Sequence, residues 1–504
     1  MDFVNKYKKE IIFFALLVLL FFFTRLYRLD SLPMFTDEAI YVRWSQIAKQ
    51  DASWRFISLT DGKQPTFIWT TLIMMRFVSD PLLAGRLASV MAGFFTMLGL
   101  FFLGREVFYK RWIGLISSAL YVVFPMALVY DRMALYDTMV GTFAVWSLFL
   151  AILLVRNLRL DTALLLGFSA GAGVLTKTSG FFNIYLLPLL FLLFDFKKQN
   201  LAQRLFRFVG LLLLVVALTQ LYYSVLRLSP FFYIIAEKNA LFVYTWHDWL
   251  DHPFNFFYGN LKGVWDWFLT YTTWSGVILI FGSYVVYKNQ WREKAVLTLW
   301  FIIPFLTLAI FGKTLYPRFI LFMILSLLPL MALSLYFLSV QSIKKPFIAL
   351  CFIIVFVLPL QSDYFILLDF AHSPIPKSDL GQYINNWPAG GGVKELVALL
   401  KDQAAYGKIF VASEGTFGSL PTYTVEIYLG NNPNIDKRGI WPITAEIPED
   451  ILAKAKIMPT FVVFNNSRFP PPKWPLIFVA KYQKGIGDAY MSVYKVDQAK
   501  VKHK

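Results

Sequence analysis

The chain has 504 residues, of which 58% are hydrophobic and 18% aromatic, and its formal net charge is +17. A soluble protein of this length has too little interior to cover so much apolar surface, so the composition argues against one and predicts a multi-pass membrane protein. Nucleic-acid binding is not expected, because the Lys and Arg residues fall in short clusters between apolar runs, as in membrane-protein loops.

Eleven apolar runs have the character of membrane spans, and we therefore expect about eleven transmembrane helices. Several runs are short for a full span, so this count carries an error of one or two. The stretch 65–78 is expected to lie in the membrane interface instead. The runs are near residues 11–27, 82–104, 112–130, 138–155, 162–175, 181–194, 206–228, 275–287, 296–312, 319–340 and 347–368.

The sides of the membrane follow from the basic residues. Lys6, Lys8 and Lys9 precede the first run, which predicts a cytoplasmic N-terminus. Every second loop from there is short and basic, as the positive-inside rule requires. These loops contain Arg105, Lys110 and Arg111; Arg156 and Arg159; Lys197, Lys198, Arg204 and Arg207; Lys288, Arg292 and Lys294; and Lys344 and Lys345.

The residues after the last run are more polar and are expected to form a separate domain outside the cytoplasm. Runs such as KIFVAS, PTFVVFNN and AYMSVYKV are typical of strands, whereas VKELVALLKDQ and PEDILAKAKIM are typical of helices. We therefore predict a transmembrane catalytic domain over residues 1–370 and an extracytoplasmic α/β domain over 371–504, within the cell membrane.

Two acidic segments, one lysine-containing segment and a basic cluster are all predicted on the outer face. They are MFTDEAIY (34–41), DRMALYD (131–137), DGKQPTF (61–67) and Lys313 with Arg318. This combination suits transfer of a sugar from a lipid phosphate to a hydroxyl or amine. Fixed cations can stabilise the charge that the leaving phosphate gains, and a carboxylate can take the proton that the acceptor loses.

Five short segments occur in a characteristic order over roughly residues 20–340. They are Asp37-Glu38, Lys63-Gln64-Pro65, Arg132 to Asp137, Thr176-Lys177-Thr178 and Pro317-Arg318-Phe319. Their order resembles that in GT-C glycosyltransferases that use polyprenyl-phosphate sugars, especially the branch of protein O-mannosyltransferases and bacterial aminoarabinose transferases. Gln64 and Thr178 depart from the family pattern. No β-trefoil-sized insertion fits the long loop 229–274, which argues against a eukaryotic-type protein mannosyltransferase.

The resemblance implies a GT-C-like fold and an inverting glycosyltransferase with Asp37 as general base. It also implies that Glu38 and Asp137 lie in or near the acceptor side and that cationic residues face the donor phosphate. The phosphate-binding candidates are Lys63, Lys177, Lys313 and Arg318, and further candidates are Asp131, Arg132 and His247. The expected partners are a polyprenyl-phosphate sugar, membrane lipids and a protein, lipid or polymer acceptor. No cofactor or metal is expected.

Each candidate also has a structural interpretation, which the sequence leaves open. Thr36 can cap a helix that Asp37 and Glu38 stabilise by their charge. Asp131 and Asp137 can be loop carboxylates paired with Arg132. The lysines and Arg318 can be membrane anchors, and His247 can belong to an aromatic interface loop. A lipid or solute transporter is the alternative function, and an inactive scaffold is a third.

Overall fold

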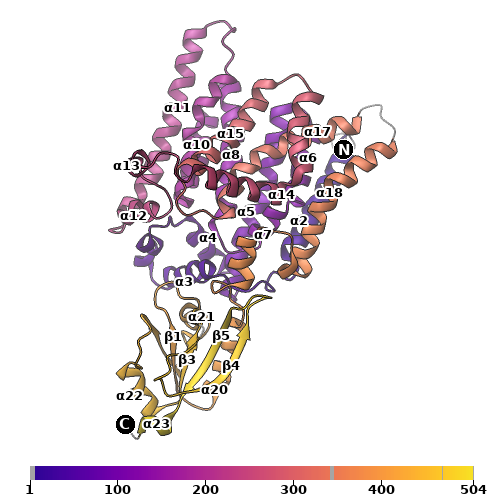
Figure 1. Ribbon diagram of the computed structural model, residues 1–504. Helices are drawn as coiled ribbons and strands as arrows, with labels where there is room; N and C mark the ends of the chain where they lie inside the picture. The colour runs from indigo at the N-terminus through magenta and orange to yellow at the C-terminus, as the bar shows by residue number, and fades with distance from the viewer. Residues whose placement is uncertain (1–5, 341–344, 468, 503–504) are drawn as a thin grey trace.

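The computed structural model describes residues 6–340, 345–467 and 469–502. It consists of a helical bundle and, below it in Figure 1, a smaller domain built around a β-sheet. Lys344, one of the predicted cytoplasmic loop residues, lies outside the described residues.

The bundle is formed by long apolar helices, and short helices fill its loops. The long helices are α2 (Lys8–Leu26), α5 (Pro81–Phe108), α6 (Arg111–Val122), α8 (Tyr136–Asn157), α9 (Leu160–Thr176), α11 (Leu201–Ser224), α14 (Phe257–Val286), α15 (Trp291–Phe311), α17 (Leu328–Val340) and α18 (Lys345–Leu368). The short helices include α3 (Thr36–Gln50), α4 (Thr66–Met74), α7 (Pro125–Asp131), α12 (Ile234–Ala240) and α13 (Trp246–Asp251).

The multi-pass membrane architecture predicted from the sequence is confirmed, but the count of eleven spans is not. Among the described residues, seven helices are long and apolar enough to cross a membrane. An eighth span results if α6 and α7, which meet at 64°, are one bent helix. The bend follows from Pro125, because proline disfavours helical conformation in the residue before it. The predicted runs 162–175 and 181–194 coincide with helices shorter than 18 residues.

The loops predicted on the cytoplasmic side lie together at one end of the bundle. The guanidinium of Arg156 pairs with Glu106 at 2.8 Å and with Glu293 at 3.3 Å, which joins three of these loops. Arg111 lies 3.7 Å from the ring centroid of Tyr7, near the N-terminus. The sheet domain lies beyond the opposite end of the bundle, next to α3 and α4 (Figure 1).

The smaller domain contains a five-stranded mixed sheet with the strand order β2-β1-β3-β5-β4. Its strands are β1 (Ile409–Glu414), β2 (Ile435–Ile440), β3 (Thr460–Phe464), β4 (Leu476–Gln483) and β5 (Tyr490–Val496). The first three strands are parallel to one another, whereas β5 is antiparallel to both of its neighbours. The α/β character is therefore confirmed. The domain boundary at residue 370 stays a prediction; α18 ends near it, at Leu368.

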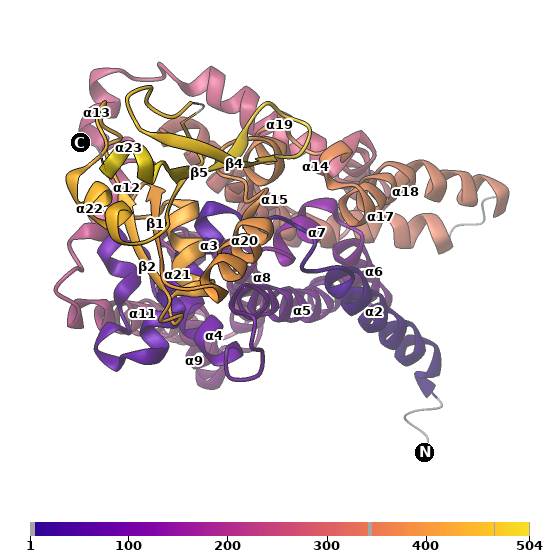
Figure 2. The same ribbon diagram turned by 90° about the horizontal axis from the view of Figure 1, so that it is seen from below.

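The helices of the sheet domain are α20 (Val393–Ala405), α21 (Leu420–Leu429), α22 (Glu449–Ile457) and α23 (Gln498–Lys502). Of these, α21 packs against α3 of the bundle. Arg43 of α3 pairs with Glu426 of α21 at 2.7 Å, and Trp44 packs on Phe417 with ring centroids 6.1 Å apart. In the view from below (Figure 2), the sheet domain lies in front of α3 and leaves α2, α17 and α18 uncovered. The sheet domain therefore covers only part of this end of the bundle.

Candidate active site

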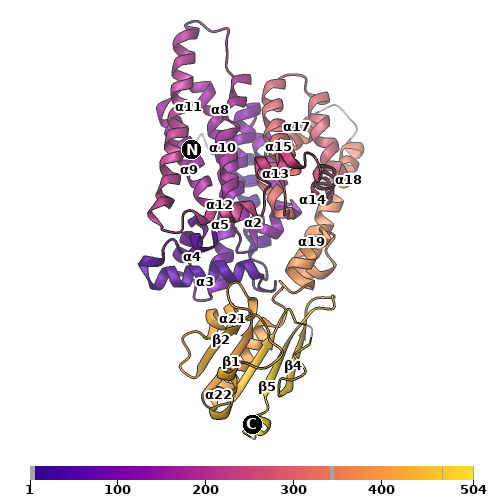
Figure 3. The same cartoon turned by 60° about the vertical axis from the view of Figure 1, so that its left-hand side comes forward.

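A cavity of about 940 Å³ lies where α3, the ends of α8 and α9, and the residues around Pro317 meet. Figure 3 shows α3, α12 and the short helix α19 (Lys377–Leu380) toward the end of the bundle that faces the sheet domain. Five of the residues predicted as functional line this cavity: Asp37, Lys63, Asp137, Lys177 and Arg318. Segments that are far apart in the sequence thus meet in one place.

Asp37 lies in the first turn of α3 and pairs with Arg318, whose Nη2 donates to its Oδ2 at 2.8 Å. The other terminal nitrogen of Arg318, Nη1, is buried and has no hydrogen-bond partner among the described residues. Burial raises the pKa of the Asp37 carboxyl, but Lys63 and Arg318 lower it, and the net pKa is below its ordinary value of 3.8. Asp37 is therefore a carboxylate at neutral pH.

Lys63 reaches the cavity from the loop before α4. Its ammonium lies 3.4 Å from Asp61 and 4.8 Å from the ring centroid of Tyr41. Lys238 of α12 pairs with the same aspartate at 2.6 Å. Asp61 therefore holds two lysines at one side of the cavity, where both can contact an anion.

Asp137 and Lys177 form an ion pair at 2.7 Å across the ends of α8 and α9. The ammonium of Lys177 also lies 4.3 Å from the ring centroid of Phe319. Burial lowers the pKa of Lys177, Asp137 opposes this shift, and the net pKa is below its ordinary value. The pair places one further cation and one further carboxylate in the cavity.

Glu38 does not line the cavity, and its expected place in or near the acceptor side stays a prediction. Its carboxylate is fully buried and accepts two hydrogen bonds from Arg86, from Nε and Nη2, both at 2.9 Å. It also accepts from the backbone N–H groups of Phe35 at 2.9 Å and Ala134 at 2.7 Å. Both carboxylate oxygens are thus engaged in joining α3 to its neighbours.

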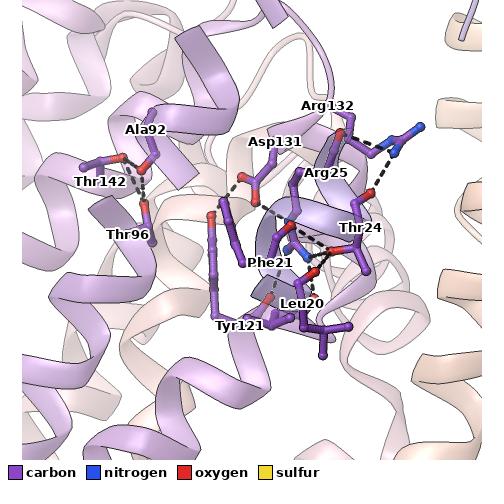
Figure 4. Close-up of polar contacts among 11 residues, drawn as sticks. Leu20, Phe21, Thr24, Arg25, Ala92, Thr96, Tyr121, Asp131, Arg132 and Thr142 are labelled. Carbon is purple, nitrogen blue, oxygen red and sulfur yellow. Dashed lines mark hydrogen bonds and ion pairs between the residues drawn. The ribbon is translucent and has the colours of Figure 1, made fainter. Parts of the chain in front are cut away.

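Asp131 and Arg132 also lie away from the cavity, in the polar cluster of Figure 4. Asp131 accepts from Arg25 at 3.1 Å and from the Tyr121 hydroxyl at 2.8 Å. Arg132 donates to the carbonyl oxygens of Thr24 at 2.7 Å and Tyr27 at 2.8 Å. The expected pairing of Asp131 with Arg132 is therefore replaced by a pairing with Arg25, and both residues fasten α2 to α7.

Lys313 and His247 lie outside the cavity as well. Lys313 is exposed, and its ammonium lies 5.7 Å from the ring centroid of Tyr244. His247 is exposed on α13 and pairs with Asp251 at 3.3 Å. In the described part of the chain, no group of three or more His, Cys, Asp or Glu residues is arranged to hold a metal ion.

Sequence reasoning missed two parts of the cavity wall. One is the end of α12, which contributes Lys238 and Asn239 from the long aromatic loop. The other is the segment 377–388, which includes Gln382, Asn386 and Trp387 and precedes α20. Its Gln, Asn and Trp side chains are an available sequence signal, because this combination is common in sites that bind polar ligands.

Two comparisons with known proteins give matches to this chain. Residues 62–223 match the model of the dolichyl-phosphate-mannose-protein mannosyltransferase family. The chain also resembles the crystal structure of ArnT from Cupriavidus metallidurans in the apo state, with a TM-score of 0.59 and 14% sequence identity over 98% of this chain and 99% of that chain. For the same protein bound to undecaprenyl phosphate, the TM-score is 0.59 and the identity 14%, over 97% of this chain and 98% of that one. No curated protein sequence matches the chain.

The cavity and the bundle together define a membrane protein with the fold of ArnT. The resemblance to GT-C glycosyltransferases that use polyprenyl-phosphate sugars is thereby confirmed. The matched segment contains Lys63, Asp137 and Lys177, three of the five predicted residues that line the cavity.

Proposed function

We propose that the protein transfers a sugar from a polyprenyl-phosphate donor to an acceptor at the outer face of the cell membrane. This proposal rests mainly on the guanidinium group of Arg318. One of its nitrogens donates to Asp37, while the buried Nη1 has no partner among the described residues. A donor phosphate at Nη1 would satisfy this nitrogen and would place the reacting sugar beside Asp37.

The charge of the cavity supports binding of an anionic donor. Among the described residues that line it, five are cationic and two are acidic. The cationic residues are Lys63, Lys177, Lys238, Arg318 and Lys377, whereas Asp37 and Asp137 are acidic. Fixed cations in a cavity shielded from water stabilise an oxyanion strongly, and the leaving phosphate becomes such an oxyanion as its bond to the sugar breaks.

The proposed reaction is a direct displacement. The acceptor oxygen bonds to the anomeric carbon while the bond from that carbon to the phosphate oxygen breaks, and its electron pair leaves with the polyprenyl phosphate. The acceptor proton passes to the carboxylate of Asp37. Attack opposite the phosphate inverts the anomeric configuration.

Donor binding would also make Asp37 a better base. The cations that lower the pKa of Asp37 are Lys63 and Arg318, the same groups proposed to bind the phosphate. A bound phosphate offsets their positive charge, so the pKa of Asp37 rises when the donor is in place. Proton transfer is thereby coupled to donor occupancy.

The test uses the full-length protein in lipid nanodiscs with a panel of undecaprenyl-phosphate sugars and a mixture of peptide, glycolipid and oligosaccharide acceptors. We expect release of undecaprenyl phosphate together with a glycosylated product of inverted configuration. Arg318→Ala should weaken donor binding and slow transfer, with a loss of about 2–4 kcal/mol in transition-state stabilisation. Lys313→Ala removes a nearby cation outside the cavity and should match the wild type.

The transporter alternative makes the opposite prediction. A transporter would move the lipid or a solute across a vesicle membrane without forming a new glycosidic bond. Vectorial movement without any glycosylated product, for every donor in the panel, would contradict the proposed function.

A further inference from the structure

The segment 377–388 forms one wall of the cavity. It consists of α19, a π-helical turn (Gly381–Asn385) and the residues up to Pro388, and it connects the bundle to the sheet domain. Ser378 and Gln382 are four residues apart in this helical stretch, and both line the cavity. Asn386 and Trp387 continue the same wall.

The other side of this segment is fixed to the bundle. Asp379 is fully buried and accepts hydrogen bonds from the hydroxyls of Tyr130 at 2.7 Å and Tyr271 at 2.5 Å. Tyr383 packs edge-on against Phe35, with ring centroids 5.0 Å apart. The wall is therefore anchored to α7, to α14 and to the residue before α3.

The end of the segment is held by both parts of the protein through two successive carbonyl groups. The carbonyl oxygen of Trp387 accepts from Nζ of Lys484 at 2.8 Å and from Nδ2 of Asn465 at 2.9 Å, both in the sheet domain. The next carbonyl oxygen, of Pro388, accepts from N–H and Oγ1 of Thr36 at 3.0 and 2.9 Å. Because Thr36 precedes Asp37, the wall is placed directly beside the proposed base.

Two polar atoms of the wall are available for hydrogen bonds to a ligand. Ser378 Oγ and Gln382 Oε1 are buried, and neither has a partner among the described residues. Buried polar atoms are nearly always hydrogen-bonded, so a bound ligand is the simplest source of the missing partners. Trp387, which also lines the cavity, is 49% exposed and can therefore contact a ligand there.

We propose that this wall, made by Ser378, Gln382 and Trp387, binds a sugar ring. A pyranose offers hydroxyl groups for the serine and glutamine, and an apolar C–H face that can pack on the indole. The inference rests on the proposed function, because the ring is that of the donor sugar or that of a carbohydrate acceptor. In either case the wall is a specificity determinant supplied by the segment that leads into the sheet domain.

The experiment compares Trp387→Ala and Gln382→Leu with wild type, using full-length protein in nanodiscs. Tyr406→Ala is the matched control, because Tyr406 is 84% exposed and lies away from the cavity. The first arm measures binding of undecaprenyl phosphate and of undecaprenyl-phosphate hexoses. The second measures transfer to alkyl glycosides and to Ser/Thr peptides over a range of acceptor concentrations.

If the wall binds the donor sugar, both variants keep wild-type affinity for undecaprenyl phosphate and lose about fivefold or more for the hexose-linked lipid. If it binds the acceptor, donor affinity is unchanged and KM rises by a similar factor for alkyl glycosides alone. If the wild type transfers sugar and the wall variants match Tyr406→Ala in both arms, sugar binding by the wall is contradicted. The proposed function then still stands. If the wild type transfers no sugar, both the proposed function and sugar binding by the wall are contradicted.

Lys484 is the positioning residue in this arrangement, because it contacts the carbonyl group of Trp387 and not the cavity. Lys484→Met should produce the same defect as Trp387→Ala, and the double variant should be no worse than Trp387→Ala alone. Lys473→Met, which removes an exposed lysine paired with Glu446, is the control. Additive effects of the two substitutions would show that Lys484 does not act through Trp387.

Discussion

Asp37 and Glu38 are adjacent carboxylates with different surroundings. The side chains of successive helical residues point about 100° apart, so one can face the cavity while the other packs into the bundle. Asp37 lines the cavity with Lys63 and Arg318, whereas Glu38 is enclosed by Arg86 and two backbone N–H groups. Separate substitutions of Asp37 and Glu38 therefore distinguish an effect on the proposed reaction from an effect on the stability of the protein.

Asp37→Asn should abolish most of the transfer while preserving donor binding. Asparagine keeps the shape of the side chain but cannot take the acceptor proton, so single-turnover transfer should fall by about 10²-fold or more. Donor affinity, measured in the same nanodisc preparation, should be unchanged or higher, because Arg318 is released from its ion pair. Near-normal transfer would contradict the assignment and would make Asp137 the next candidate.

The pH dependence follows from the direction of the Asp37 pKa shift. Since this pKa is lowered in the free protein, the carboxylate remains ionised as the pH falls through 5. The acid limb of kcat/KM should therefore lie below pH 4, because kcat/KM reports the free enzyme. An acid limb near pH 6 would show that another group serves as the base.

At the scale of single elements, α3 depends on the buried pair of Glu38 and Arg86. Glu38→Gln leaves the guanidinium of Arg86 buried with neutral partners alone, so the protein should lose about 3–5 kcal/mol of stability. Thermal unfolding in nanodiscs measures this loss, and Glu38→Gln with Arg86→Met should recover part of it. A variant of wild-type stability that fails in transfer would instead indicate a role in the reaction.

The positions of the bundle helices were easier to predict than the roles of individual residues. Apolar runs located the bundle helices, because burial in lipid requires a continuous apolar stretch. By contrast, only the family resemblance favoured Asp137 over Asp131, since their different surroundings depend on packing against residues such as Arg25 of α2. The wall segment was missed for a related reason. Its contribution depends on contacts with Tyr130, Tyr271 and Lys484, which are distant in the sequence.

At the scale of the whole molecule, the residues proposed to react lie at the end of the bundle near the sheet domain. At the other end of the bundle (Figure 1), Arg156 links three of the basic loops through Glu106 and Glu293. This separation was predictable, because the positive-inside rule assigns alternate loops to opposite sides. We expect the basic end to face the cytoplasm.

Cysteine labelling tests that orientation. After replacement of Cys351, single cysteines at Ser53 and Tyr406 should react with a membrane-impermeant maleimide on intact cells, because both positions are exposed near the proposed outer face. A cysteine at Gln199, in the loop before α11, should react only after permeabilisation. Labelling of Gln199 on intact cells would reverse the assignment of sides.

The paired carbonyl contacts at Trp387 and Pro388 have a consequence for chimeric proteins. A chimera that exchanges the sheet domain between relatives would ordinarily have its junction just before α20. With this junction, the residues around Gln382 would come from one parent protein, whereas Lys484 and Asn465 would come from the other. The contacts of Lys484 and Asn465 with the carbonyl group of Trp387 would then join residues of different parents. A junction before Lys377 takes all of these residues from the same parent protein. However, Asp379 and its partners Tyr130 and Tyr271 would then come from different parents. If the wall binds a sugar as proposed, substrate preference would depend on the contacts between the two domains, and neither domain would determine it alone.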